Sequence, residues 1–282
     1  MGHSLGWTVN HPGHIVFLLD LSQSMRGEKI KVVMDVLRQT CVKLLGNAEN
    51  DEGEIDNSFS TTIIGYNSDV KRLFPLSGDG NALELEKLLL ATKGQAMFDY
   101  SEGGVAEPKW QTFTADAFAA ARKDVEAWIN TGNRNLKPAP VIIHITDGHP
   151  EENDDPLSSS ISKALREAEA IKGIKSADGS ALLFNFYINP KSNMATRFPV
   201  SAPQVQGDDG EFLKFLFESS SVMEDGDIKK ALAEGFREAR TNSRFMVVNE
   251  ADRAAFAKLI IFVSSMGFLS AGTVDREPVK PQ

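Results

Sequence analysis

Short runs of apolar residues alternate along this chain with longer stretches in which apolar residues recur every three or four positions. Residues 15–19, 139–148 and 180–189 form apolar runs that predict strands buried on both faces. Residues 58–67 and 69–76 predict two strands joined by the turn Asn-Ser-Asp. A last short strand is expected at 244–248.

The longer stretches have the 3.6-residue period of amphipathic helices. One follows the first strand at 30–45, and another, at 159–173, begins with serines that we expect to cap it and ends at Gly173. This alternation predicts a doubly wound α/β fold, with a mostly parallel sheet and helices on both faces. The other predicted helices are 81–93, 114–129, 211–219, 227–239 and 250–266.

We expect a single domain over residues 14–270. Residues 1–13 form an N-terminal extension, and residues 271–282 form a flexible tail. Within the domain, the segment 189–210 is rich in Pro, Ser and Gly and predicts an irregular surface excursion.

Composition narrows the class of protein. The 282 residues are 41% hydrophobic, which suffices for a core, and the net charge is −9 with a pI near 5.2. A nucleic-acid-binding protein needs a basic surface, so we expect neither nucleic acid nor membrane as a partner. The single cysteine, Cys41, excludes an intrachain disulfide and suits the cytoplasm. No signal peptide or membrane span is recognisable.

Two acidic residues end buried strands: Asp20 follows the run at 15–19, and Asp147 follows the run at 139–146. In a parallel sheet both project onto the same rim, where ligands bind. If the loop after Asp20 is extended, Ser22 and Ser24 face the same side as Asp20. Such oxygen atoms suit a small hard cation such as Mg²⁺ or Mn²⁺, whereas in isolation the same residues are equally typical of a turn.

The pattern D-x-S-x-S at 20–24 with T-D-G at 146–148 resembles the von Willebrand factor type A domain and its metal-ion-dependent adhesion site (MIDAS). The stretch "WQTFTADAF" is similar to the family's GGTxxGxAL, although Trp110 and Gln111 replace its glycines. This match implies Thr112 as the ligand from a third segment, with Thr114 as the alternative. "TDGHP" resembles bacterial cytosolic members associated with tellurite resistance. The resemblance therefore implies a metal site formed by Asp20, Ser22, Ser24, Thr112 and Asp147.

The resemblance implies a protein-binding scaffold or adaptor in which a divalent ion, Mg²⁺ or Mn²⁺ rather than Ca²⁺, binds a carboxylate of a partner protein. We expect no enzymatic activity, because phosphotransferases with an aspartate nucleophile usually carry D-x-D and this chain has Ser22. The alternatives are a metal-dependent hydrolase or phosphatase and an RNA-associated member of the family. His149 lies close enough to the rim to touch the metal site or a partner, and His144 is expected in the sheet with a local hydrogen bond.

Overall fold

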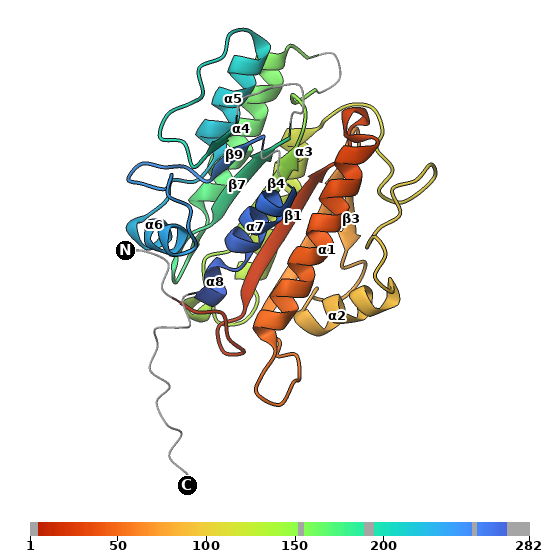
Figure 1. Ribbon diagram of the computed structural model, residues 1–282, viewed down its shortest axis with the longest axis vertical. Helices are drawn as coiled ribbons and strands as arrows, with labels where there is room; N and C mark the ends of the chain where they lie inside the picture. The colour runs from red at the N-terminus through yellow and green to blue at the C-terminus, as the bar shows by residue number, and fades with distance from the viewer. Residues whose placement is uncertain (1–4, 152–154, 189–194, 250–252, 270–282) are drawn as a thin grey trace.

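The computed structural model describes residues 5–151, 155–188, 195–249 and 253–269. A seven-stranded sheet, in the order β3-β2-β1-β4-β7-β9-β8, forms its middle layer (Figure 1). The neighbouring strands β2, β1, β4, β7 and β9 are parallel, and β3 and β8 are antiparallel at the edges. β5 and β6 form a separate hairpin. The strands are β1 (Gly13–Asp20), β2 (Phe59–Tyr66), β3 (Val70–Phe74), β4 (Val141–Thr146), β5 (Lys175–Ser176), β6 (Gly179–Ser180), β7 (Leu182–Tyr187), β8 (Thr196–Arg197) and β9 (Met246–Val248).

Helices cover both faces of the sheet, as the sequence predicts. α1 and α7 pack against each other on one face, and α3, α4 and α5 lie on the other (Figure 1). In the described ranges, no helix has both the length and the apolar character needed to cross a bilayer. The helices are α1 (Glu28–Ala48), α2 (Ala82–Ala91), α3 (Thr114–Ile129), α4 (Leu157–Gly173), α5 (Asp208–Ser219), α6 (Asp225–Ala233), α7 (Arg253–Ser264) and α8 (Met266–Leu269), with 3₁₀ turns η1 (Gln23–Met25) and η2 (Arg134–Leu136).

The apolar run at 15–19 within β1 is explained by burial on both faces of the sheet. Ile15, Phe17 and Leu19 pack into the core beneath α1 and α7. Val16 and Leu18 point to the opposite face and pack beneath α3 and α4. All five side chains are fully buried, and each burial stabilises the fold by about 2 kcal/mol. Within this run every side chain is therefore apolar, and the next residue, Asp20, is polar and ends the strand.

Several boundaries differ from the sequence prediction. α4 begins at Leu157 after Pro156, so the serines that were expected to cap it lie inside its first turn, and no side chain caps this end. α5 begins at Asp208 and β8 lies at Thr196–Arg197, so the predicted excursion at 189–210 contains regular structure. The predicted closing helix is divided into α7 and α8. The predicted tail at 271–282 and residues 189–194 lie outside the described ranges.

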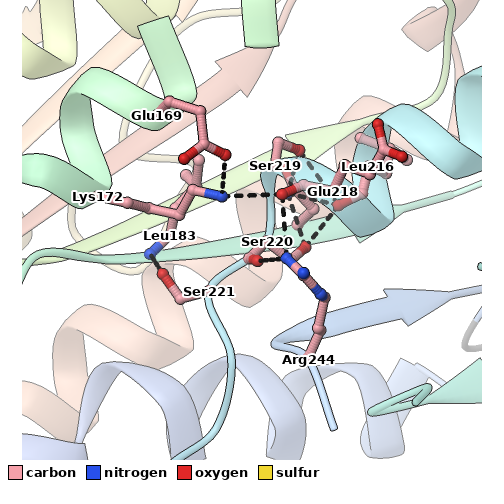
Figure 2. A network of polar contacts seen from close by, with 10 residues as sticks. Glu169, Lys172, Leu183, Leu216, Glu218, Ser219, Ser220, Ser221 and Arg244 are labelled. Carbon is pink, nitrogen blue, oxygen red and sulfur yellow. Dashed lines mark hydrogen bonds and ion pairs between the residues drawn. The ribbon is translucent and has the colours of Figure 1, made fainter. Parts of the chain in front are cut away.

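The C-terminal end of α5 is held by two cations. Lys172 Nζ donates to the Glu218 carbonyl over 2.8 Å, and Arg244 Nη1 donates to the carbonyls of Glu218 and Ser220 over 3.1 and 2.8 Å (Figure 2). The last carbonyls of a helix carry partial negative charge and lack intrahelical partners, so both contacts are favourable. Ser221 Oγ then accepts from the Leu183 amide over 2.9 Å, which docks the segment after α5 onto β7.

Asn185 connects α5 to the interior of the sheet. Its side chain is fully buried in β7. Nδ2 lies 3.1 Å from the Leu216 carbonyl, 3.0 Å from Ser219 Oγ and 2.9 Å from Ser220 Oγ, so it donates into the final turn of α5. Oδ1 lies 2.7 Å from His144 Nδ1 on the neighbouring strand β4. One amide therefore pairs buried polar groups of β4 and α5 on the same face of the sheet.

We expect Asn185→Leu, which preserves the side-chain volume, to lower the free energy of unfolding by about 3 kcal/mol, because it leaves buried His144 Nδ1 without its partner and removes the hydrogen bonds that Nδ2 donates to the end of α5. Urea denaturation measures the change. Asn135→Leu, at an exposed position, is the control and should change the free energy of unfolding by less than about 0.5 kcal/mol. Equal effects of the two substitutions would contradict the structural role given to Asn185.

Candidate metal centre

The candidate site lies where the strand order of the sheet reverses. Asp20 is the last residue of β1, and Asp147 directly follows β4. β1 and β4 are parallel neighbours, so their carboxyl ends lie side by side. From this point the chain continues to β2 on one side of β1, whereas β4 leads to β7 on the other. Ligands of open α/β sheets bind at such a reversal.

Ser22 and Ser24 reach this rim by a route different from the predicted one. The expectation of an extended loop is wrong beyond Ser22, because Gln23–Met25 form the 3₁₀ turn η1. The Ser22 amide donates to Asp20 Oδ1 over 2.7 Å, and this local hydrogen bond bends the chain into the turn. Ser22 Oγ and Ser24 Oγ nevertheless lie 3.0 Å apart. Ser22 is buried, whereas Ser24 is exposed to solvent.

Asp147 joins this group from β4. Its Oδ1 accepts a hydrogen bond of 2.6 Å from Ser24 Oγ. Its Oδ2 accepts from Nζ of Lys29 in the first turn of α1. The Asp147 side chain has no exposed surface, and the Lys29 side chain is 25% exposed. Segments separated by more than a hundred residues thus meet in direct polar contact.

Of the two threonines considered as the third-segment ligand, Thr112 faces these oxygen atoms. Thr112 Oγ1 and Ser24 Oγ lie 3.9 and 3.6 Å from the position that a Cβ on Gly148 would occupy, so both flank the same spot. Thr114 is the first residue of α3, and its hydroxyl forms a hydrogen bond with the Tyr66 side chain instead. The geometry therefore favours Thr112, while the ligand role itself stays a prediction.

The loop before α3 keeps its place without the two glycines of the family pattern. The Thr112 amide donates to the Glu151 carbonyl over 3.3 Å, and the Glu151 amide donates back over 3.0 Å. The Phe113 amide donates to the Asn67 carbonyl over 2.9 Å. Trp110, at the first glycine position, is 70% exposed and needs no space inside the site. Backbone pairing with both neighbouring loops therefore positions Thr112.

The environment of Asp20 disfavours its negative charge. Burial, followed by the nearby charge of Asp147, raises the pKa of Asp20 to about 6. Hydrogen bonds from Thr146 Oγ1 to Oδ2, over 2.6 Å, and from Ser22 act in the opposite direction. Two buried carboxylates in one site favour the binding of a cation, because a cation stabilises the charged forms of both.

Next to Asp20, a second group of buried side chains is hydrogen-bonded inside the sheet. Tyr66 ends β2 in register with Asp20. Tyr66 Oη lies 2.6 Å from His144 Nε2, and His144 Nδ1 lies 2.7 Å from Asn185 Oδ1. Burial lowers the pKa of His144 to about 4. Neutral His144 therefore donates to Asn185, whose oxygen can only accept, and accepts from Tyr66.

Sequence reasoning identified His144 as a hydrogen-bonded core histidine but missed Tyr66 and Thr146. The sequence contains a signal for both residues. Tyr66 is the last residue of a predicted strand next to the one that ends at Asp20, and Thr146 is part of T-D-G. Polar side chains that end neighbouring strands share one rim, so they should have been considered with the carboxylates.

His149 faces α5 and not the cluster of hydroxyl groups. Its Nε2 lies 3.1 Å from Asp209 Oδ1 in the first turn of α5. Its ring packs edge-on against Phe212, with ring centroids 4.9 Å apart. Within the described ranges His149 contacts none of the candidate ligands, so the structure gives no support to a role at the metal. Contact with a partner stays a prediction.

The oxygen atoms fit a small divalent cation. Ligands at about 2.1 Å from an octahedral ion lie about 3.0 Å apart along one edge, which is the separation of the Ser22 and Ser24 hydroxyls. Exposed Ser24 leaves the cluster open to solvent on one side. Nowhere in the described ranges, this cluster included, do three His, Cys, Asp or Glu side chains converge in a way that could hold a metal ion, so the hydroxyl groups would have to complete the ligand set. The residues that would hold the ion are Asp20, Ser22, Ser24, Thr112 and Asp147.

Comparison with known proteins agrees with this architecture. The sequence model of the von Willebrand factor type A domain matches residues 14–181. Proximal thread matrix protein 1 from the mussel byssus, solved with a zinc-occupied MIDAS motif, superposes with a TM-score of 0.50 at 12% identity over 92% of this chain and 48% of its own.

The pilus adhesin SpaC from Lactobacillus rhamnosus GG, in its open conformation, superposes with a TM-score of 0.51 at 12% identity over 94% of this chain and 31% of its own. The chain thus spans about half of the mussel protein and less of the adhesin, and these likenesses show the fold alone. None of the curated proteins compared with the chain matches it.

We expect the charge of Asp20 to destabilise the metal-free protein at neutral pH. Its raised pKa means that the folded state binds more protons than the unfolded state between about pH 4 and pH 6, so this group's contribution falls as the pH rises through that range. His144, with its lowered pKa, acts in the opposite direction, because its contribution rises over about pH 4 to 6.5. A comparison of two proteins that both retain His144 therefore isolates Asp20.

Asp20→Asn removes the titrating group and keeps an acceptor for the Ser22 amide. We expect the free energy of unfolding of this variant, relative to the metal-free wild type, to increase by about 3 kcal/mol between about pH 4 and pH 6.5. Urea titrations in the presence of a chelator measure the difference. A difference that does not change with pH would show that Asp20 is ionised as easily as an exposed carboxyl group.

Proposed function

The chain belongs to the von Willebrand factor type A family, and on that basis we propose that it is a protein-binding scaffold or adaptor that acts through a metal ion at its MIDAS. Domains of this family with such a site generally mediate metal-dependent protein interactions. The resident ion would be Mg²⁺ or Mn²⁺, because every candidate ligand atom is a hydroxyl or carboxylate oxygen. Ca²⁺ suits this site less well, since it usually takes six to eight oxygen ligands.

The observation that carries the proposal is the composition of the donor set. Three donors, Ser22, Ser24 and Thr112, are neutral hydroxyl groups, and Asp20 and Asp147 are the only carboxylates brought to the cluster by the described residues. The hydroxyl groups add no negative charge, so a bound divalent cation would face only the two carboxylates of Asp20 and Asp147 and would remain a stronger electrophile than in a site made of carboxylates alone. It would attract an anionic group on the open side, where Ser24 meets solvent.

We further propose that the partner is a protein that presents an Asp or Glu side chain to this open side. A carboxylate bound to the ion gives a directional, charge-assisted contact. The chain's net charge of −9 makes general attraction of an acidic partner unfavourable, so recognition would depend on the local positive charge of the ion. We also propose a cytoplasmic location, in keeping with a single cysteine that is buried and whose pKa burial raises to about 12.

A metal-dependent hydrolase is the second candidate, and the contacts of the two carboxylates disfavour it. Asp20 accepts hydrogen bonds from the Ser22 amide and Thr146 Oγ1, and it is fully buried. Asp147 is paired with Ser24 and Lys29. A nucleophile must reach the substrate, and a general acid needs a mobile proton next to it. An RNA-associated role is disfavoured by the acidic composition.

We expect Ser22→Ala to lower partner affinity at least about tenfold in Mg²⁺, because it removes one oxygen ligand without adding charge. The measurement is affinity capture from native lysate, followed by titration of the purified partner. A chelator should abolish binding by the wild type. Ser162→Ala, which removes an exposed hydroxyl on α4, is the matched control and should bind as the wild type does. Binding that survives both the chelator and Ser22→Ala would contradict the proposed function.

A phosphatase assay separates the binding function from the hydrolase. We expect no turnover of phosphate monoesters by the wild type with either Mg²⁺ or Mn²⁺, since no described residue offers an unengaged carboxylate at the cluster. Release of inorganic phosphate is the readout. Turnover that disappears in Asp20→Ala would establish an enzyme and overturn the binding proposal.

A further inference from the structure

Lys29 occupies a position that normally disfavours a cation. It is the second residue of α1, where the partial positive charge of the helix N-terminus repels a basic side chain. Glu28, the first residue, has the favourable charge. Lys29 Nζ nevertheless contacts Asp147 Oδ2, and three quarters of its side chain is covered, with 25% exposed. The contact with Asp147 offsets the unfavourable position on the helix.

The other nearby cation is oriented away from the cluster. Arg26 Nε donates to the Pro108 carbonyl over 3.0 Å, and Nη2 lies 3.5 Å from Glu107 Oε1. The Arg26 side chain is 56% exposed. Lys29 therefore brings a positive charge directly to a candidate ligand, whereas Arg26 serves to tie the 107–112 loop to the loop after β1.

We propose that Lys29 is a resident counter-cation that sets the affinity of this site for divalent ions, an inference that rests on the proposed metal-dependent function. In the metal-free protein its ammonium group compensates part of the charge that Asp20 and Asp147 bring together. An ion that binds Asp147 has to share this carboxylate with Lys29. The two cations repel each other at short range, where solvent screens them only in part, so Lys29 weakens metal binding.

The same charge has a second effect once the ion is bound. Lys29 adds a positive charge beside the ion, on a side chain that is still partly exposed. The site therefore gives up affinity for the ion and gains attraction for an anionic partner. Lys29 acts as a specificity-determining residue, because it favours the ternary arrangement of protein, ion and carboxylate over the ion alone.

Isothermal titration of chelator-treated protein with MgCl₂, and separately with MnCl₂, tests the inference. We expect Lys29→Met to bind Mg²⁺ at least about tenfold more tightly than the wild type, because the competing charge is gone. Lys29→Arg keeps the charge and should stay within about threefold of the wild type. Lys31→Met is the matched control, since Lys31 lies on the same turn of α1, is 53% exposed and pairs only loosely with Glu28 at 3.9 Å. It should leave Mg²⁺ affinity within about twofold of the wild type.

The direction of the change distinguishes a counter-cation from a residue that merely orients Asp147. An orienting residue would weaken metal binding when replaced, so a lower affinity of Lys29→Met overturns the inference, as does an affinity equal to that of Lys31→Met.

The metal-free melting temperature supplies a second readout, and we expect it to fall in Lys29→Met but not in Lys31→Met. If Lys29→Met does not fold, Lys29→Gln keeps a hydrogen-bond donor without the charge and has the same expected gain in affinity. Failure of the wild type to bind either ion contradicts the proposed function itself, and the inference with it, whereas equal binding by the variants contradicts the inference alone.

Discussion

The approach of two buried carboxylates at the ends of adjacent parallel strands is the constraint on which the site depends. Asp20 and Asp147 are brought together by the pairing of β1 with β4, and like charges in a poorly solvated place repel. Each neighbouring contact can be understood as a response to that repulsion. The Ser22 amide and Thr146 donate to Asp20, and Ser24 and Lys29 donate to Asp147. These donors reduce the cost of the charges without removing it, which leaves the cluster attractive to a cation.

Buried polar side chains lie beside this pair of carboxylates in an otherwise largely apolar sheet. Thr146 donates to Asp20, Tyr66 donates to His144, and His144 donates to Asn185, which reaches the end of α5. Tyr66, His144 and Asn185 thus satisfy one another inside the sheet, where an unpaired polar group would be costly. Lys172 and Arg244 bind carbonyls at the C-terminal end of α5, next to the residues that Asn185 contacts (Figure 2). The candidate ligand Asp20 is itself held by Thr146 on the neighbouring strand β4 and by the Ser22 amide.

Much of this architecture could be predicted from sequence, and the parts that could not have physical causes. Buried parallel strands read as apolar runs in the sequence. The strands β1, β4 and β7, and the positions of Asp20 and Asp147 at strand ends, could therefore be predicted. The 3₁₀ turn after β1 was not, because it depends on one backbone hydrogen bond from Ser22. The choice between Thr112 and Thr114 was also beyond the sequence, since both are buried threonines and only the contacts of Tyr66 and Gly148 separate them. The contact of Lys29 with Asp147 depends on how the first turn of α1 lies beside the residue after β4, which periodicity and motifs do not specify.

The distribution of the site along the chain has a consequence for how the protein matures. Its oxygen atoms come from the loop after β1, from the residue two positions before α3 and from the loop after β4. No single segment can assemble the cluster, because its formation requires contacts between residues more than a hundred positions apart. Formation of the cluster therefore requires that β4 is docked beside β1. An ion with no affinity for the unfolded chain would be captured by native molecules only, and its capture would protect them from unfolding by mass action.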